Sequence, residues 1–479
     1  MLRSTTLVVV AFATSANAHA PRDTVARLDS IAHEVARIGA RHGEAIWPGF
    51  RPDTIPLSFV LPSHGDVLFG WRGTLPQGYV ALDNGGAWRG QRALGAASTG
   101  TMLEGRRVAQ VVVNGHDAAM LVATALHEAF HVFENASKKP AAKFGRGENS
   151  MLVSTYPVFD VDDEAAFALE GKILAAALTS SSKRTLARQF VAVRRARHRR
   201  LPGEFAEFDQ LSELNEGLAE YVLVRGLRYV ESEGPRGWRA VAASAIAART
   251  VLLANLTGSE NLSLRFRYYQ TGPAQALLLD DLAGPTWKTR MLAENSTLQD
   301  MLAVASGVDS VAMLALRGAA AAFDTASLRA RAESGIGRLR SARRAKADSL
   351  LSQPGVLLVL AADSLPGKDF NACGYDPQNL LQVTSSVNIQ MRWWKPCAVG
   401  LTSAEFNVPS VHDEAAGTIR AVLSDVTLTS NGVVLDVRDG ETMRNVRAFK
   451  LDSPRASVQA VRADISRSGA TLSIWPKAP

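Results

Sequence analysis

Apolar residues recur at intervals of three and four over much of the chain, and this spacing predicts a mainly helical protein between residues 22 and 351. The first such stretch, residues 22–42, carries its apolar side chains on one helical face: Val25, Leu28, Ile31, Val35 and Ile38. From Asp117 to about Leu351, Ala and Leu dominate and prolines interrupt the pattern. We therefore expect one amphipathic helix near the start and a long helical region later.

The stretch between Trp47 and Gly115 has a different texture. It is rich in Gly and Pro and contains short apolar runs at residues 57–61 and 108–113. Runs of this length predict the strands of a small sheet. Asp117 then stands where an N-cap of the following helix is expected.

The helical pattern stops at Ser-Gln-Pro-Gly, residues 352–355, which predicts a domain boundary. Short β-type runs follow, and two of them flank Asn431-Gly432, a dipeptide typical of tight hairpins. Ser468-Gly469 marks a second hairpin. We predict an α+β protein with a helical domain of residues 19–351 that includes a small N-terminal sheet, and a sandwich-like all-β domain of residues 356–479.

The first eighteen residues have the pattern of a secretory signal peptide. Arg3 precedes a short apolar run at residues 7–13, and Ala16-Asn17-Ala18 forms a small-x-small cleavage site. The apolar run is too short to span a bilayer. We expect an exported protein, secreted or periplasmic, without an integral membrane segment after cleavage.

Composition narrows the class of protein further. The 479 residues include 53 Lys+Arg and 46 Asp+Glu, a net charge of +7, and only two cysteines. This modest surplus does not indicate nucleic acid as a partner. Two cysteines exclude a disulfide-dense scaffold and a thiolate zinc site, but in an exported protein Cys373 and Cys397 are predicted to form a disulfide.

Arginines crowd residues 188–200, which also carry an apolar face. The pattern favours a solvated basic helix face, with contact to an acidic cell-envelope polymer as the alternative. Glu170, an acid within an apolar helical stretch, is a candidate to support a functional site, although no spacing argument stands behind it.

The chemically informative segment is Thr124–Phe133, which contains His127-Glu128-x-x-His131. Histidines four apart lie on one face of a helix, so both imidazoles reach a single metal ion, with Glu128 beside a metal-bound water. Two ordinary core histidines are the alternative. The segment resembles the extended signature of the zincin metallopeptidases.

A catalytic zinc site needs a third protein ligand. The metzincin branch of zincins is excluded because Glu134 and Ser137 stand where its Gly and His would be. Leu214-Asn215-Glu216-Gly217-Leu218-Ala219-Glu220-Tyr221 resembles the stretch that supplies the third ligand in gluzincins. The resemblance implies that Glu216 binds zinc and that Glu220 orients a ligand histidine from behind. Gly217 is expected to let the helix of Glu216 approach the helix of His127 and His131 closely.

The sequence departs from the gluzincin pattern in one respect. The segment between His131 and Glu216 is much longer than in the best-known members, which predicts a helical insertion. Glu148 lies nearer the usual spacing and competes with Glu216, although its neighbours read as a loop. Tyr268 and Tyr269 are candidates to stabilise the oxyanion, with simple aromatic packing as the alternative for each.

Taken together, the resemblance implies an exported Zn²⁺-dependent peptidase that acts on peptide or protein substrates, with Glu128 as general base. Two alternatives remain open at this point. One is a catalytically silent zincin-fold binding or scaffold protein, and the other is a metal-dependent hydrolase of a non-peptide amide in cell-envelope material.

Overall fold

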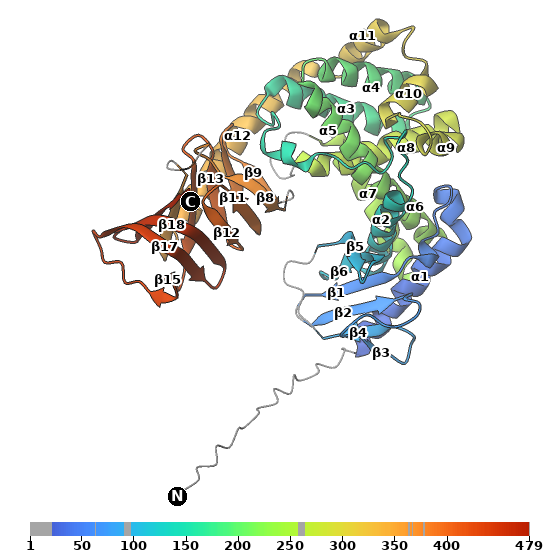
Figure 1. Cartoon of the computed structure of the whole chain (residues 1–479). Helices are drawn as coiled ribbons and strands as arrows, with labels where there is room; N and C mark the ends of the chain where they lie inside the picture. Colours follow the sequence, from blue (N-terminus) through green and yellow to red (C-terminus); the bar gives the residue numbers. More distant parts are fainter. Residues whose placement is uncertain are drawn as a thin grey trace, which may run out of the picture. The chain divides into compact units, whose positions relative to one another are not determined.

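The computed structural model describes residues 22–62, 64–90, 97–256, 264–362, 365, 367–376 and 379–478, so the predicted signal peptide lies outside the described residues. The chain forms two compact units. Figure 1 shows their helices and strands, coloured along the sequence. The first runs up to Ala136 and includes Val222–Ile246, and the second combines Ser137–Tyr221 with Ala247–Pro479. The boundary predicted at residues 352–355 falls inside the second unit, between its last helix and its first strand.

A six-stranded sheet lies in the first unit, with strand order β3-β4-β2-β1-β6-β5. All neighbours are antiparallel except β1 and β6, which run parallel. Every residue of β1 is buried, because the strand lies inside the sheet. The two strands expected from the sequence are β1 and β6, and the bounds are β1 Leu57–Leu61, β2 Gly65–Phe69, β3 Val80–Ala81, β4 Ala87–Arg89, β5 Thr99–Leu103 and β6 Arg106–Val112.

This unit also contains two long helices, α1 (Arg22–Ile46) and α2 (Ala118–Ala136), with the short 3-10 turn η1 (Pro52–Thr54) after α1, and its segment Val222–Ile246 is helical as well. The predicted apolar face of α1 is buried, and Trp47 and Phe50 pack their rings against Phe130 of α2. α2 packs on β5 and β6, and at Gly100 of β5 an added Cβ would stand 3.4 Å from the Cβ of His131. The sheet and α1 therefore hold α2 in place.

The helical part of the second unit is built around α3, α4, α5 and α8, while α6 and α7 each begin in one unit and end in the other. The bounds are η2 Ser150–Ser154, α3 Val161–Thr179, α4 Lys183–His198, α5 Gly203–Ser212, η3 Glu213–Gly217, α6 Leu218–Glu233, α7 Arg236–Ala254, η4 Leu264–Arg267, α8 Tyr268–Ala283, α9 Thr286–Met291, α10 Leu298–Ser306, α11 Ala312–Ala322 and α12 Thr325–Leu351.

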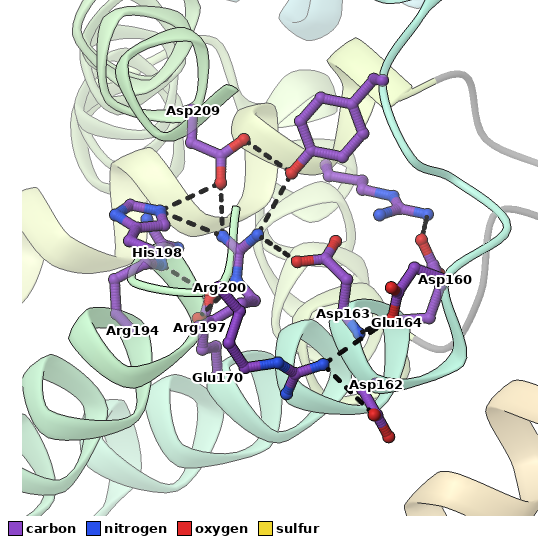
Figure 2. A network of polar contacts seen from close by, with 12 residues as sticks. Asp160, Asp162, Asp163, Glu164, Glu170, Arg194, Arg197, His198, Arg200 and Asp209 are labelled. Atoms are coloured by element: carbon purple, nitrogen blue, oxygen red, sulfur yellow. Dashed lines mark hydrogen bonds and ion pairs between the residues drawn. The ribbon is translucent and has the colours of Figure 1, made fainter. Parts of the chain in front are cut away.

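A buried network of charged side chains joins these helices (Figure 2). Arg197 of α4 lies at its centre and donates to Asp163 at 3.0 Å, to Glu170 at 2.8 Å and to Asp209. Arg194, one turn earlier on α4, donates to the second oxygen of Glu170 at 2.6 Å. The network thus links α3, α4 and α5 through hydrogen bonds between buried charged side chains.

The burial of these arginines corrects the expectation of a solvated basic face. Arg194 is 0 % exposed and Arg197 is 1 % exposed. Their charges are tolerated because carboxylates of neighbouring helices meet them, with Glu170 bridging both. Arginines elsewhere on the same helix remain at the surface, among them Arg195, which pairs with the exposed Asp309.

Glu213 extends the network to η3. Its two carboxylate oxygens accept from the two terminal nitrogens of Arg194 at 2.9 and 3.0 Å, and one of them also accepts from the Thr271 hydroxyl of α8 at 2.5 Å. The side chain is 1 % exposed. Glu213 therefore anchors η3 to α4 and α8.

Substituting Glu213→Gln is expected to lower the free energy of unfolding by about 3 kcal/mol, because it breaks a buried ion pair from one side. Urea unfolding followed by circular dichroism measures this. Glu207→Gln, at an exposed position of α5, is the matched control and is expected to change stability by less than about 0.5 kcal/mol. Equal stability of the two variants would show that the Glu213–Arg194 pair contributes nothing.

The C-terminal part is all β, and its thirteen strands form one hydrogen-bonded, curled sheet. The main path is β16-β15-β17-β18-β19-β7-β14-β13-β10-β9, while β12 pairs with β18 and β11, and β8 pairs with β11. The bounds are β7 Val356–Ala361, β8 Asn371–Tyr375, β9 Leu380–Gln382, β10 Val387–Gln390, β11 Trp394–Cys397, β12 Leu401–Phe406, β13 Ser410–Asp413, β14 Thr418–Leu423, β15 Thr427–Ser430, β16 Val433–Val434, β17 Thr442–Ser453, β18 Ala456–Ser468 and β19 Thr471–Lys477.

Both predicted hairpins are present in this sheet. Asn431 and Gly432 turn β15 into β16 with φ angles of 50° and 79°, as the tight turn requires. Gly469 turns β18 into β19. Cys373 of β8 and Cys397 of β11 form the predicted disulfide, with their Cα atoms 5.7 Å apart.

The expected mixed architecture is therefore confirmed, with a helical region that carries a small sheet followed by an all-β part whose single sheet curls over its own core. That core contains Leu358, Leu360, Trp394, Phe406, Ile419, Phe449, Leu451, Ile465 and Ile474. Among the described residues, no helix is both long and apolar enough to cross a membrane.

Candidate metal centre

The two histidines and the glutamate of the zincin-like motif lie together on α2. The side chain of His131 is 13 % exposed, and His127 and Glu128 are each 5 % exposed. One ligand atom from each of the three lies within 4.8 Å of the others. Their helical spacing of one and four residues brings this about, as the sequence predicts.

The two imidazoles converge on one point. Nε2 of His127 and Nε2 of His131 are 3.1 Å apart, and the ring planes are inclined by 77°. With metal–nitrogen bonds of about 2.05 Å, this separation corresponds to a nitrogen–metal–nitrogen angle of about 100°, close to tetrahedral. The pair therefore fits one zinc ion.

Glu134 supports this pair and was missed as a functional residue in the sequence. Its Oε2 lies 3.0 Å from Nδ1 of His131, and the side chain is 2 % exposed. A carboxylate here accepts a hydrogen bond from Nδ1–H of His131, which makes Nε2 the ring nitrogen that can bind a metal. The only signal in the sequence is the spacing of three residues from His131, which places both side chains on one face of α2.

Glu216 lies on η3, a single π-helical turn between α5 and α6. Such turns are frequent at functional sites because they change the direction of the side chains. Gly217 has no room for a side chain, since an added Cβ would stand 2.6 Å from Cα of Gly272 in α8. Gly217 thus allows a close approach to α8. The sequence predicts instead a close approach to the helix that carries the two histidines.

The competing carboxylate, Glu148, is a direct neighbour of Glu216. Arg265 donates to Glu148 at 2.7 Å and also to Glu216. Asn215 bridges the same two carboxylates, at 2.8 Å to Glu148 and 3.3 Å to Glu216. Burial lowers the pKa of Arg265, but the carboxylates of Glu216 and Glu148 outweigh burial and raise it, so Arg265 stays a cation.

Glu220, on the first turn of α6, accepts from Arg249 of α7 at 2.7 and 2.8 Å. This charge-assisted contact ties the start of α6 to α7. The expected role of Glu220 behind a ligand histidine stays a prediction.

The two candidate tyrosines differ in their surroundings. Tyr268 is 0 % exposed, and its hydroxyl donates to Asp209 at 2.5 Å within the buried network. Burial and the Asp209 carboxylate raise the pKa of Tyr268 well above its usual value. Tyr268 therefore has the structural role that the sequence allows as the alternative to oxyanion stabilisation. Tyr269 is half-buried, and its ring contacts that of the exposed Phe266 with the two ring planes inclined by 51°.

His127, Glu128, His131 and Glu134 belong to the first unit, whereas Glu148, Glu216, Glu220 and both tyrosines belong to the second. The structure brings the motif residues together and brings Glu216 and Glu148 together. The assignment of Glu216 as the third ligand stays a prediction. Comparisons with protein-family models, with curated proteins and with solved structures found no match to this chain.

Proposed function

We propose that this protein is an exported zinc-dependent peptidase. The observation that carries the proposal is the convergence of Nε2 of His127 and Nε2 of His131 at 3.1 Å, with the carboxylate of Glu128 in the same cluster. Imidazole nitrogens are ligands that zinc prefers, and a carboxylate beside them can accept the proton of a metal-bound water. The bond from His131 to the buried Glu134 adds the second layer of contacts that metal-ligating histidines ordinarily have.

A zinc ion held by His127, His131 and the proposed third ligand Glu216 would lower the pKa of a bound water and polarise a carbonyl. Glu128, the neighbour of His127, accepts the proton of the attacking water and later delivers it to the leaving amine. Glu128 is 5 % exposed, which favours this role. A carboxylate shielded from bulk water passes its proton to the reactant beside it and not to the solvent.

Tyr269 is the proposed donor to the developing oxyanion. Tyr269 lies four residues after Arg265 in the sequence, and its side chain is half-buried. The hydroxyl of Tyr268, by contrast, donates a hydrogen bond to Asp209. The signal-peptide pattern and the Cys373–Cys397 disulfide support export into an oxidising compartment.

The function is tested by incubating the purified mature protein with unstructured peptides, after chelation and again after addition of zinc. Cleavage that chelation abolishes and zinc restores is the expected result. Cleavage of an envelope polymer amide without cleavage of peptides would replace the peptidase by an amide hydrolase. Zinc binding with no hydrolysis of either would leave a binding protein.

Glu134→Gln is expected to weaken zinc affinity by about 10–100-fold, because the amide no longer holds the Nδ1 proton of His131 as a charged acceptor does. Competition with a chromophoric zinc chelator measures this affinity without any assay of activity. Glu44→Gln, at an exposed position near the end of α1, is the control and is expected to bind zinc as the parent does. Equal zinc affinity of all three proteins would remove Glu134 from the site.

A further inference from the structure

A hollow of about 800 Å³ opens on the sheet of the all-β part, where β12, β15, β17 and β18 adjoin. Arg447 and Lys450 of β17 and Arg462 of β18 line it, together with Thr402 of β12 and Asn431 of the β15–β16 turn. The volume lies within the range of pockets that bind small ligands or short polymer segments.

The positions of the two arginines destabilise the sheet. Arg447 and Arg462 are direct cross-strand partners, so their side chains leave the sheet side by side. Like charges in this arrangement repel each other and destabilise a strand pair. Among the described residues neither arginine forms an ion pair, and the Arg462 guanidinium donates to the carbonyl of Ala478 at 2.9 Å.

The backbone next to the arginines is also strained. Ala448 has a φ of 43°, in the left-handed region that a residue with a Cβ rarely adopts. Val461 of β18, which also lines the hollow, is 47 % exposed. Neither the strained backbone of Ala448 nor the exposed side chain of Val461 stabilises the fold. Strained backbone conformations are frequent at ligand-binding sites.

The lining determines the class of ligand. Paired guanidinium groups bind carboxylates through parallel N–H bonds. Lys450 forms an ion pair with Asp452 at 2.6 Å, so the two arginines supply the unpaired positive charge of the lining. Ala448 and Val461 are apolar residues that also line the hollow. The only aromatic residue of the lining, Phe449, is 1 % exposed and offers no ring face for stacking a sugar.

We propose that this hollow binds an acidic peptide segment, in which a Glu or Asp side chain meets Arg447 and Arg462 and an apolar side chain next to it meets Ala448 and Val461. This binding site goes beyond the proposed peptidase function and does not rest on it. Its occupant is a peptide because charge and apolar contact are combined there without an aromatic platform.

The test uses the mature full-length chain carrying Glu128→Gln, so that a peptide is not consumed. The probe is a short fluorescein-labelled peptide of alternating Glu and Leu, compared by fluorescence anisotropy with the same peptide carrying Gln for Glu. We expect the Glu peptide to bind at least about tenfold more tightly, and the double substitution Arg447→Gln/Arg462→Gln to abolish that difference.

The control variant is Arg438→Gln, which removes one positive charge from an exposed position outside the hollow and is expected to leave binding unchanged. Arg447→Gln alone, which removes the repulsion between two paired arginines, is expected to weaken binding several-fold and to leave the thermal unfolding temperature unchanged or higher. Equal binding of the Glu and Gln peptides, or unchanged binding by the double variant, would overturn the proposal. Arginine-dependent binding of polygalacturonate with no preference for the Glu peptide would also overturn it, in favour of an acidic polysaccharide.

Discussion

Replacing Glu128 by Gln is expected to lower the rate of peptide cleavage by roughly 10²–10⁴-fold, the contribution typical of a general acid–base group. Glutamine keeps the shape of the side chain but cannot accept the proton of the attacking water. Because His127 and His131 are unchanged, the variant is expected to bind zinc as the parent does. Cleavage of an unstructured peptide and elemental analysis of zinc measure the two quantities on the same sample.

Glu231→Gln, at an exposed position of α6, is the matched control for this experiment. It makes the same chemical change away from the metal cluster, so full activity is expected. If Glu128→Gln cleaves peptides as fast as this control, Glu128 is not the base. If Glu128→Gln loses both zinc and activity, the residue supports the metal site and its role as a base loses its evidence.

Elemental analysis is expected to find about one zinc ion per chain, lost in His127→Ala and in Glu216→Gln but retained in Glu148→Gln. The two glutamates make a matched pair, because both accept from Arg265 and from Asn215. Either substitution therefore removes one charged acceptor of Arg265. A difference in zinc content between them is due to ligation and not to the loss of this shared contact.

The comparison also has outcomes that contradict the assignment. Zinc lost in Glu148→Gln and retained in Glu216→Gln would make Glu148 the third ligand and leave the zincin reading intact. Zinc retained at full occupancy in His127→Ala would remove the basis of the metal site itself. Circular dichroism of each variant establishes that it is folded before its zinc content is compared.

The elements that the sequence predicts well are those with a strong local pattern. The apolar face of α1, the strands β1 and β6 and the turn at Asn431-Gly432 depend on periodicity and turn chemistry within a few residues. The cluster of His127, Glu128 and His131 belongs to the same class. One helical turn is enough to bring the two rings together, so no information from distant parts of the chain is required.

The arginines of α4 illustrate the opposite case. The sequence shows a crowd of positive charges, which favours a solvated face, but Arg194 and Arg197 are buried. Their burial depends on Glu170 of α3, Asp209 of α5 and Glu213 of η3, and nothing in α4 indicates these partners. A charge is buried or exposed according to the groups that other helices place around it.

By itself, the amino-acid sequence determined the helical and β regions of the chain, the pairing of the two cysteines and the helix that carries His127, Glu128 and His131, because these features follow from local spacing and from a single possible pairing. Only the tertiary structure decided that Glu134 supports His131, that Tyr268 is committed to Asp209, and that Arg447 and Arg462 stand side by side beside a hollow. The contacts of Tyr268 and of the two arginines join segments separated in the chain, and the Glu134 contact needs one rotamer among several. Both kinds of contact are selected by packing and by the pairing of buried charge, which are properties of the folded chain as a whole.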